Sequence, residues 1–148
     1  MEIRFTKGAG KYDRMEVVRD NGGRANVDCP KQGIIPHDMV HYAVESVLAK
    51  RGFIARVAAG EVAAFNMNVE DETDGVERLV EVLQADGWSG WQSTAEDILS
   101  LYKSTCGARS CHPLDVGAND IEVVRERILA LTAQWEAIPT GGALSLVF

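Results

Sequence analysis

Two histidines four residues apart are the side chains with the clearest potential for chemistry in this chain. His37 and His41 enclose the sequence His-Asp-Met-Val-His. If the segment is helical, both imidazoles project from the same side of the helix, about 6 Å apart along its axis. One metal ion can bridge that separation, and zinc commonly binds imidazole nitrogen atoms. The spacing therefore predicts that His37 and His41 bind zinc or another divalent transition metal.

The same five residues resemble the HExxH pattern of zinc metalloproteases, with Asp38 in the place of the glutamate. In that pattern the glutamate is the general base that acts on metal-bound water. Aspartate is shorter by one methylene group, about 1.5 Å, and this distance weakens direct proton abstraction. The resemblance implies metal-assisted hydrolysis with Asp38 as a candidate catalytic residue, and we do not expect proteolysis.

A third ligand is needed, because catalytic zinc sites usually have three protein ligands. Glu45 lies on the same helix face, but it is about 12 Å from His37 along a straight helix, so the three side chains cannot all bind one ion. His41 could pair with either of them. Glu45 is therefore a candidate catalytic base or orienting group. The remaining ligand candidates stay open: Cys29, Cys106, Cys111, His112 and the acidic residues of segment 70–77.

Both histidines also fit a structural role. A histidine at the margin of an apolar stripe often donates one N–H to a carbonyl or carboxylate group and packs its ring against the core. The chain would then be a non-catalytic interaction or regulatory module. Its acidic surface and an amphipathic helix over residues 119–138 would contact a protein partner or a second copy of the chain.

Charge and composition restrict the classes of partner. The chain has 148 residues, with 15 lysines and arginines against 22 acidic residues, for a net charge of −7. This sign disfavours binding to a phosphate backbone, so we expect no nucleic-acid partner. No apolar run is long enough to cross a bilayer, and the N-terminus lacks a basic stretch followed by an apolar one. We therefore expect a cytoplasmic protein with no membrane partner.

Hydrophobic periodicity predicts an α+β fold in one domain over residues 1–148. Strands are expected at 2–6, 14–20 and 24–28, as an antiparallel meander that a C-terminal strand at 143–148 joins. Four helices are expected: at about 36–51 with Gly52 as its stop, from an N-terminal cap at Asp74, from a cap at Ser93, and at 119–138 with a cap at Asn119. Segment 53–65 fits a strand or a helix, and segment 66–75 is expected to be a solvated loop.

A broader resemblance involves the first predicted helix and its neighbours. Residues 36–45 (Pro-His-Asp-Met-Val-His-Tyr-Ala-Val-Glu) follow Ile-Arg-Phe-Thr at 3–6 and Val-Arg-Asp-Asn-Gly at 18–22. They precede Gly-Phe at 52–53 and Val-Ala-Ala-Gly at 57–60. This arrangement resembles a family of uncharacterised bacterial proteins. The resemblance implies a bacterial source and a shared helix, but no reaction.

The cysteines form a second candidate group. Three cysteines are an odd number, and the chain shows no export signal, so free thiols are expected rather than a disulfide framework. Cys106 and Cys111 nevertheless lie close in sequence and precede His112. The sequence leaves open a disulfide between them, a metal site in this loop, or unpaired thiols.

Overall fold

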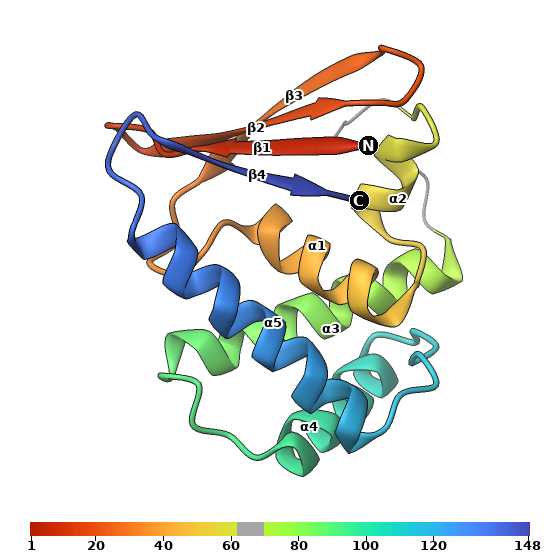
Figure 1. Cartoon of the computed structure of the whole chain (residues 1–148). Coiled ribbons are helices and arrows are strands. Elements are labelled where there is room, and N and C mark those ends of the chain that lie inside the picture. Colours follow the sequence, from red (N-terminus) through yellow and green to blue (C-terminus); the bar gives the residue numbers. More distant parts are fainter. Residues whose placement is uncertain (62–69) are drawn as a thin grey trace.

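A four-stranded antiparallel sheet forms one layer of the molecule (Figure 1). The computed structural model describes residues 1–61 and 70–148. The strands are β1 (Glu2–Thr6), β2 (Tyr12–Val18), β3 (Arg24–Pro30) and β4 (Ala143–Val147), in the order β3-β2-β1-β4. The predicted meander and its closure by the C-terminal strand are therefore confirmed.

One face of the sheet is apolar, because successive side chains of a strand point to opposite faces. Ile3 and Phe5 of β1 are fully buried, and they pair with Val17 and Met15 of β2, which are fully buried as well. On the other side of β1, Leu146 of β4 pairs with Ile3. The sheet thus presents a continuous apolar surface to the helices.

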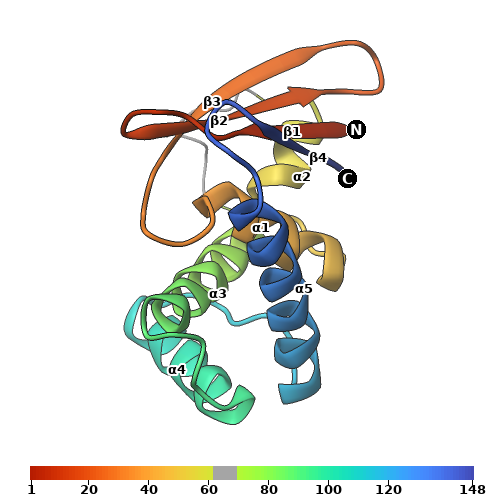
Figure 2. The same ribbon diagram turned by 60° about the vertical axis from the view of Figure 1, so that its left-hand side comes forward.

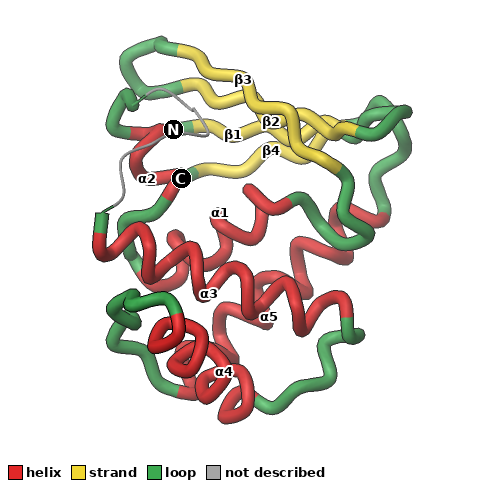
Figure 3. The backbone as a smooth tube through the Cα atoms, turned by 180° about the vertical axis from the view of Figure 1, so that it is seen from behind, coloured by secondary structure: helices red, strands yellow, loops and turns green. Residues whose placement is uncertain are grey.

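Five helices are found among the described residues, all on one side of the sheet. They are α1 (His37–Leu48), α2 (Phe53–Ala58), α3 (Asp71–Trp88), α4 (Ala95–Ala108) and α5 (Ala118–Glu136). Helix α1 lies between the sheet and the pair α3 and α5, and α4 lies farthest from the sheet (Figures 1 and 2). The view from behind shows α2 near both chain termini (Figure 3). The α+β class is confirmed, with one helix more than predicted.

The extra helix, α2, lies in the segment whose periodicity fitted either a strand or a helix. Residues 62–65 of that segment lie outside the described residues, as do residues 66–69 of the predicted loop. The prediction of a solvated loop over 66–75 is wrong from residue 71 onward, because α3 begins at Asp71 rather than after a cap at Asp74. Three acidic residues in its first turn favour this earlier start, since negative charge stabilises a helix N-terminus.

Three other helices differ from their predicted boundaries. Helix α1 ends at Leu48, before Gly52, because Ala49 adopts a left-handed backbone conformation with φ 51°. Helix α4 is capped by Thr94 rather than Ser93, and the Thr94 hydroxyl accepts a hydrogen bond from the Asp97 N–H. Helix α5 begins at Ala118, one residue before Asn119. The Asp120 carboxylate accepts a hydrogen bond from the backbone N–H of Gly117, the residue that precedes the helix.

The amphipathic pattern predicted for α5 is confirmed. Its buried residues recur every three or four positions, as the helical period requires: Ile121, Val124, Ile128, Leu131 and Trp135. They pack into the same hydrophobic cluster as α1 and the sheet. Within the described part of the chain, no helix has the length and apolar character needed to span a bilayer.

The Tyr102 side chain connects α4 to α3 and to the loop before α5. Its hydroxyl group donates a hydrogen bond to the Gly75 carbonyl at 2.8 Å and accepts one from the Leu114 N–H at 2.8 Å. Both bonds are buried. A buried backbone group that loses its partner costs about 1–3 kcal/mol, so this hydroxyl contributes to the packing of all three segments.

Replacing Tyr102 by phenylalanine should lower the free energy of unfolding by about 1–3 kcal/mol, because two buried backbone groups lose their partner. Urea unfolding followed by circular dichroism measures the change. Tyr12→Phe is the matched control, since Tyr12 is 56% exposed, and it should leave stability almost unchanged. Equal stability of the two variants would contradict the role of the Tyr102 hydroxyl.

Candidate metal centre

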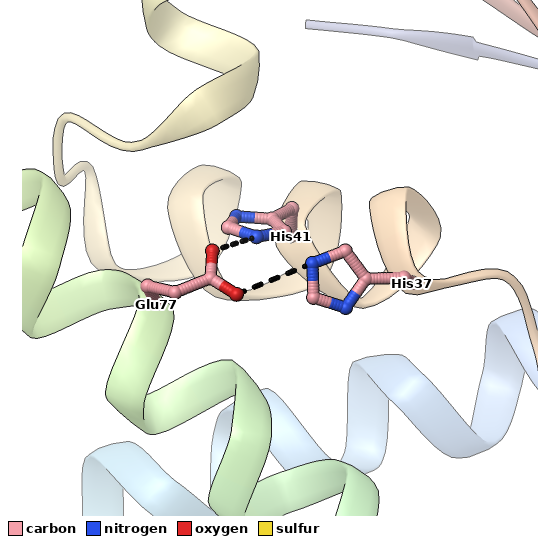
Figure 4. Close-up of side chains that lie close together, drawn as sticks. All are labelled: His37, His41 and Glu77. Carbon is pink, nitrogen blue, oxygen red and sulfur yellow. Dashed lines mark hydrogen bonds and ion pairs between the residues drawn. The ribbon is translucent and has the colours of Figure 1, made fainter. Parts of the chain in front are cut away.

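Three side chains from two neighbouring helices point toward one another (Figure 4). His37 and His41 come from α1, and Glu77 comes from α3. The Nε2 atom of His41 lies 2.8 Å from Oε2 of Glu77, and the Nε2 atom of His37 lies 3.4 Å from Oε1 of the same carboxylate. Taking one ligand atom from each residue, the three atoms lie within 4.8 Å of one another, close enough for one metal ion.

The two imidazoles share a side of α1, as their spacing predicts. Their ring centroids are 4.8 Å apart and the rings meet edge to face, with an angle of 73° between their planes. Glu77 belongs to segment 70–77, which was one of the alternatives for the third ligand. Among the described residues, this is the one group of three or more His, Cys, Asp or Glu side chains arranged closely enough to hold an ion.

Each imidazole is held by a hydrogen bond on its other nitrogen atom. The Nδ1 atom of His41 lies 3.1 Å from the Glu45 carboxylate, and the Nδ1 atom of His37 lies 3.0 Å from the side-chain oxygen of Gln84. Carboxylate and amide oxygens only accept hydrogen bonds, so both Nδ1 atoms donate. This fixes the rings with both Nε2 atoms directed at Glu77. The same type of contact orients metal-binding histidines in general.

Glu45 is held by the backbone at the start of α2. The carboxylate is buried, with 1% exposure, and it accepts hydrogen bonds from three backbone N–H groups, those of Gly52, Ile54 and Ala55, at 2.9–3.1 Å. Together with His41 it has four hydrogen-bonding partners. The Glu45 carboxylate lies so close to the backbone of residue 52 that a glycine is required there, since a Cβ atom would lie 2.6 Å from the Glu45 Cδ atom. The geometry places Glu45 as an orienting group for His41.

Asp38 is not brought to the imidazoles. It is buried, and one of its carboxylate oxygens accepts a hydrogen bond from the Cys29 thiol at 3.4 Å. Burial, together with the neighbouring Asp38 carboxylate, raises the pKa of Cys29 well above its usual range. Neither residue belongs to the group of His37, His41 and Glu77, and the same holds for Cys106 in the last turn of α4 and for Cys111 and His112 in the loop that follows.

The protonation of the cluster is governed by its hydrogen bonds. Burial alone would lower the pKa of His41, but the hydrogen bonds with Glu45 and Glu77 raise it from 6.5 to about 10. Burial and the nearby His41 would lower the pKa of His37, but its hydrogen bond with Glu77 and the negative charges of Glu77 and Asp38 together raise it. Burial would raise the pKa of Glu77, but its hydrogen bonds with both histidines lower it. A proton and a metal ion would therefore compete for the same Nε2 atoms.

One side of the cluster faces solvent. The His41 side chain is 1% exposed, whereas the side chains of His37 and Glu77 are 36% and 31% exposed. An ion bound between these three side chains would be enclosed by protein on the His41 side and accessible to water on the His37 side.

Sequence reasoning missed Gln84 and did not single out Glu77. These residues are seven positions apart, two helical turns, and so share one face of α3. The spacing is visible in the sequence, but nothing in it indicates that this face of α3 packs against the histidine face of α1. Comparisons of the chain with protein-family models, curated proteins and solved structures find no match.

The cluster should make stability depend on pH in protein kept free of metal by a chelator. The raised pKa of His41 gives stability that is complete below pH 6.5 and lost as the pH rises toward 10. The lowered pKa of Glu77 gives stability that is present above pH 4.5 and lost as the pH falls below that value. We therefore expect the contribution of the cluster to be greatest between pH 4.5 and 6.5.

Urea unfolding at a series of pH values measures this dependence. Glu77→Gln removes one of the two carboxylates that raise the pKa of His41, the other being Glu45, so the loss of stability between pH 6.5 and 10 should become smaller. Glu81→Gln is the matched control, one turn further along α3, where the glutamate pairs with Arg78 at 3.1 Å. If the stability of the Glu77→Gln protein depended on pH as that of the wild type does, Glu77 would not be a cause of the raised pKa of His41.

Proposed function

We propose that this protein binds a divalent transition metal, with zinc as the first candidate, through the Nε2 atoms of His37 and His41 and the carboxylate of Glu77. One observation supports this most strongly. Both imidazoles are anchored through Nδ1, while both Nε2 atoms face the same carboxylate. The three groups are thus preorganised around a common point before any ion arrives.

The three groups lie near the spacing of zinc ligands, and some movement of the side chains would close them around one ion, since one ligand atom from each lies within 4.8 Å of the others. Two ligands bound tetrahedrally to zinc at about 2.0–2.1 Å are about 3.3 Å apart. The separation of 3.4 Å between His37 Nε2 and Glu77 Oε1 is close to this value. The separation of 2.8 Å between His41 Nε2 and Glu77 Oε2 would have to widen by roughly 0.5 Å to reach the spacing of tetrahedral ligands. A small rotation of the Glu77 side chain would provide this, since that side chain is partly exposed.

The types and number of ligands favour a catalytic metal site over a structural one. Two imidazoles and one carboxylate suit zinc and other first-row divalent metals. Structural zinc sites usually have four protein ligands, whereas catalytic ones keep a position for water or substrate. The proposed set has three protein ligands and a solvent-facing side. We therefore propose metal-assisted hydrolysis as the reaction class.

The surrounding residues define how such a reaction would handle protons. A divalent ion lowers the pKa of bound water to about 7 and so supplies a hydroxide nucleophile. Glu45 already accepts four hydrogen bonds, and Asp38 is paired with Cys29, so neither carboxylate is placed to accept the proton. Glu77 needs only one oxygen for the metal. Its second oxygen is the candidate proton acceptor.

The main alternative is a structural cluster in a non-catalytic interaction or regulatory protein. The raised pKa values of His37 and His41 favour it, because two imidazolium groups can share the Glu77 carboxylate without any ion. In that case the cluster would connect α1 to α3 as a partly buried ion-pair network. The two hypotheses differ in whether a chelator affects the protein.

Titration with zinc should show one site per chain in protein purified without a histidine tag. His37→Ala should lower the affinity by more than 100-fold, because it removes a ligand. Gln84→Ala should lower it by about 10–100-fold, since it removes only the group that orients His37. Isothermal titration calorimetry in competition with a chelator measures these changes. His112→Ala, which alters an exposed histidine, is the matched control and should bind like the wild type.

The melting temperature provides the second readout of that titration. A ligand that binds only the folded state raises apparent stability, so zinc should raise the melting temperature of the wild type and a chelator should reverse the increase. Near-zero zinc in the wild type, together with a melting temperature that is indifferent to chelator, would reject the metal site and favour the structural cluster.

Zinc-loaded protein should hydrolyse an activated ester or phosphate ester, with p-nitrophenyl acetate and p-nitrophenyl phosphate as probes. The rate should rise with pH around the pKa of metal-bound water, near 7, and should fall to background in His37→Ala or after chelation. Absorbance of released nitrophenolate measures it. A wild type that binds zinc without accelerating either reaction would contradict the hydrolytic class and leave metal binding intact.

A further inference from the structure

The C-terminus of α4 is closed by a specific backbone motif. The Cys111 N–H donates a hydrogen bond to the Cys106 carbonyl at 2.9 Å, and the Ser110 N–H donates one to the Gly107 carbonyl at 3.4 Å. Ser110 has a positive φ of 53°. These two bonds around a left-handed residue define a Schellman motif. The motif turns the chain back so that Cys111 lies beside the last turn of α4.

Two cysteines occupy the positions that touch each other in this motif. A Schellman motif commonly has a side-chain contact between the residues at the two ends of its longer hydrogen bond. Here those residues are Cys106, which is fully buried, and Cys111, which is half-buried. Burial and a side-chain hydrogen bond with Cys106 raise the pKa of Cys111 to about 12. The motif thus places the two side chains beside each other at the end of α4, with Cys111 the more exposed of the two.

We propose that Cys106 and Cys111 form a reversible intramolecular disulfide, with a low-molecular-weight disulfide as the oxidant. A disulfide requires two cysteines whose Cα atoms lie about 4.4–6.8 Å apart with their side chains facing each other. The backbone hydrogen bond between the two residues holds them side by side. The bond can therefore form without dismantling the end of the helix.

The exchange takes place in two balanced steps. The Cys111 thiolate attacks one sulfur atom of the oxidant, which gives a mixed disulfide and releases one thiolate. Cys106 then loses its proton and attacks the Cys111 sulfur atom, which forms the internal disulfide and releases the second thiolate. In sum, two cysteine thiols are oxidised to one disulfide and the external disulfide is reduced to two thiols. Cys111 reacts first because Cys106 is buried.

A metal site is the competing use of these thiols, and the structure disfavours it. Among the described residues, no third histidine, cysteine or carboxylate lies close enough to both sulfur atoms to complete a ligand group. Cys29 is buried elsewhere and pairs with Asp38, so it is not a competing partner for either thiol. The pair is therefore suited to exchange chemistry between its own two members.

Treatment of the native protein with oxidised glutathione, followed by mass spectrometry, tests the proposal. The intact mass should fall by two hydrogen atoms, and two of the three thiols should be lost. Arg109 lies between the cysteines, so trypsin should release peptides 104–109 and 110–125 joined by the disulfide. Dithiothreitol should restore all three thiols. The rate should rise about tenfold per pH unit below the pKa of Cys111, since the thiolate is the attacking species.

Variants separate the two steps. Cys106→Ala should stop at the mixed disulfide, with one glutathionyl group on Cys111. Cys111→Ser changes a half-buried side chain and should leave Cys106 unmodified in the folded protein. Cys29→Ser is the matched control and should form the internal disulfide like the wild type. A wild type that retains three free thiols, or that accumulates glutathione on Cys111 without the internal bond, would overturn the proposal.

Discussion

The carboxylate of Glu45 is a charge placed in the interior of the molecule, and the architecture around α1 satisfies it. A buried charge without partners would cost several kcal/mol. Glu45 avoids that cost through three backbone N–H groups at the start of α2 and the Nδ1 atom of His41. The same carboxylate therefore fixes where α2 begins, why position 52 must be glycine, and how the His41 ring is turned.

Packing between helices gives the candidate site its rigidity. The two histidines lie one turn apart on α1, and Glu77 and Gln84 lie two turns apart on α3, so all four side chains project from regular backbone. Sites on regular elements hold their geometry better than sites on loops. The apolar faces of the sheet and of α5 enclose α1 from its other sides. The positions of the two Nε2 atoms follow from this packing rather than from a bound ligand.

Local sequence information predicted the elements and half of the site. Alternation of period two located the strands, and the four-residue spacing placed both imidazoles on one side of α1. The helix starts were displaced by one to four residues, because several acidic or hydroxyl residues near each start compete as caps and only packing selects among them. Gln84 was not predicted for another reason, and Glu77 was only one of several acidic candidates in segment 70–77. They meet the histidines only through the contact of α1 with α3, and such a contact between distant segments leaves no periodic signal.

X-ray absorption spectroscopy of the zinc-loaded protein reports the atoms bound to the ion, and so shows whether His37, His41 and Glu77 are its ligands. Binding to these residues predicts a first shell of nitrogen and oxygen at about 2.0–2.1 Å, with the imidazole signature of two histidines and no sulfur. The imidazole contribution should be halved in His37→Ala. A sulfur shell at about 2.3 Å would place the ion on cysteine instead, and would contradict the assignment to His37, His41 and Glu77.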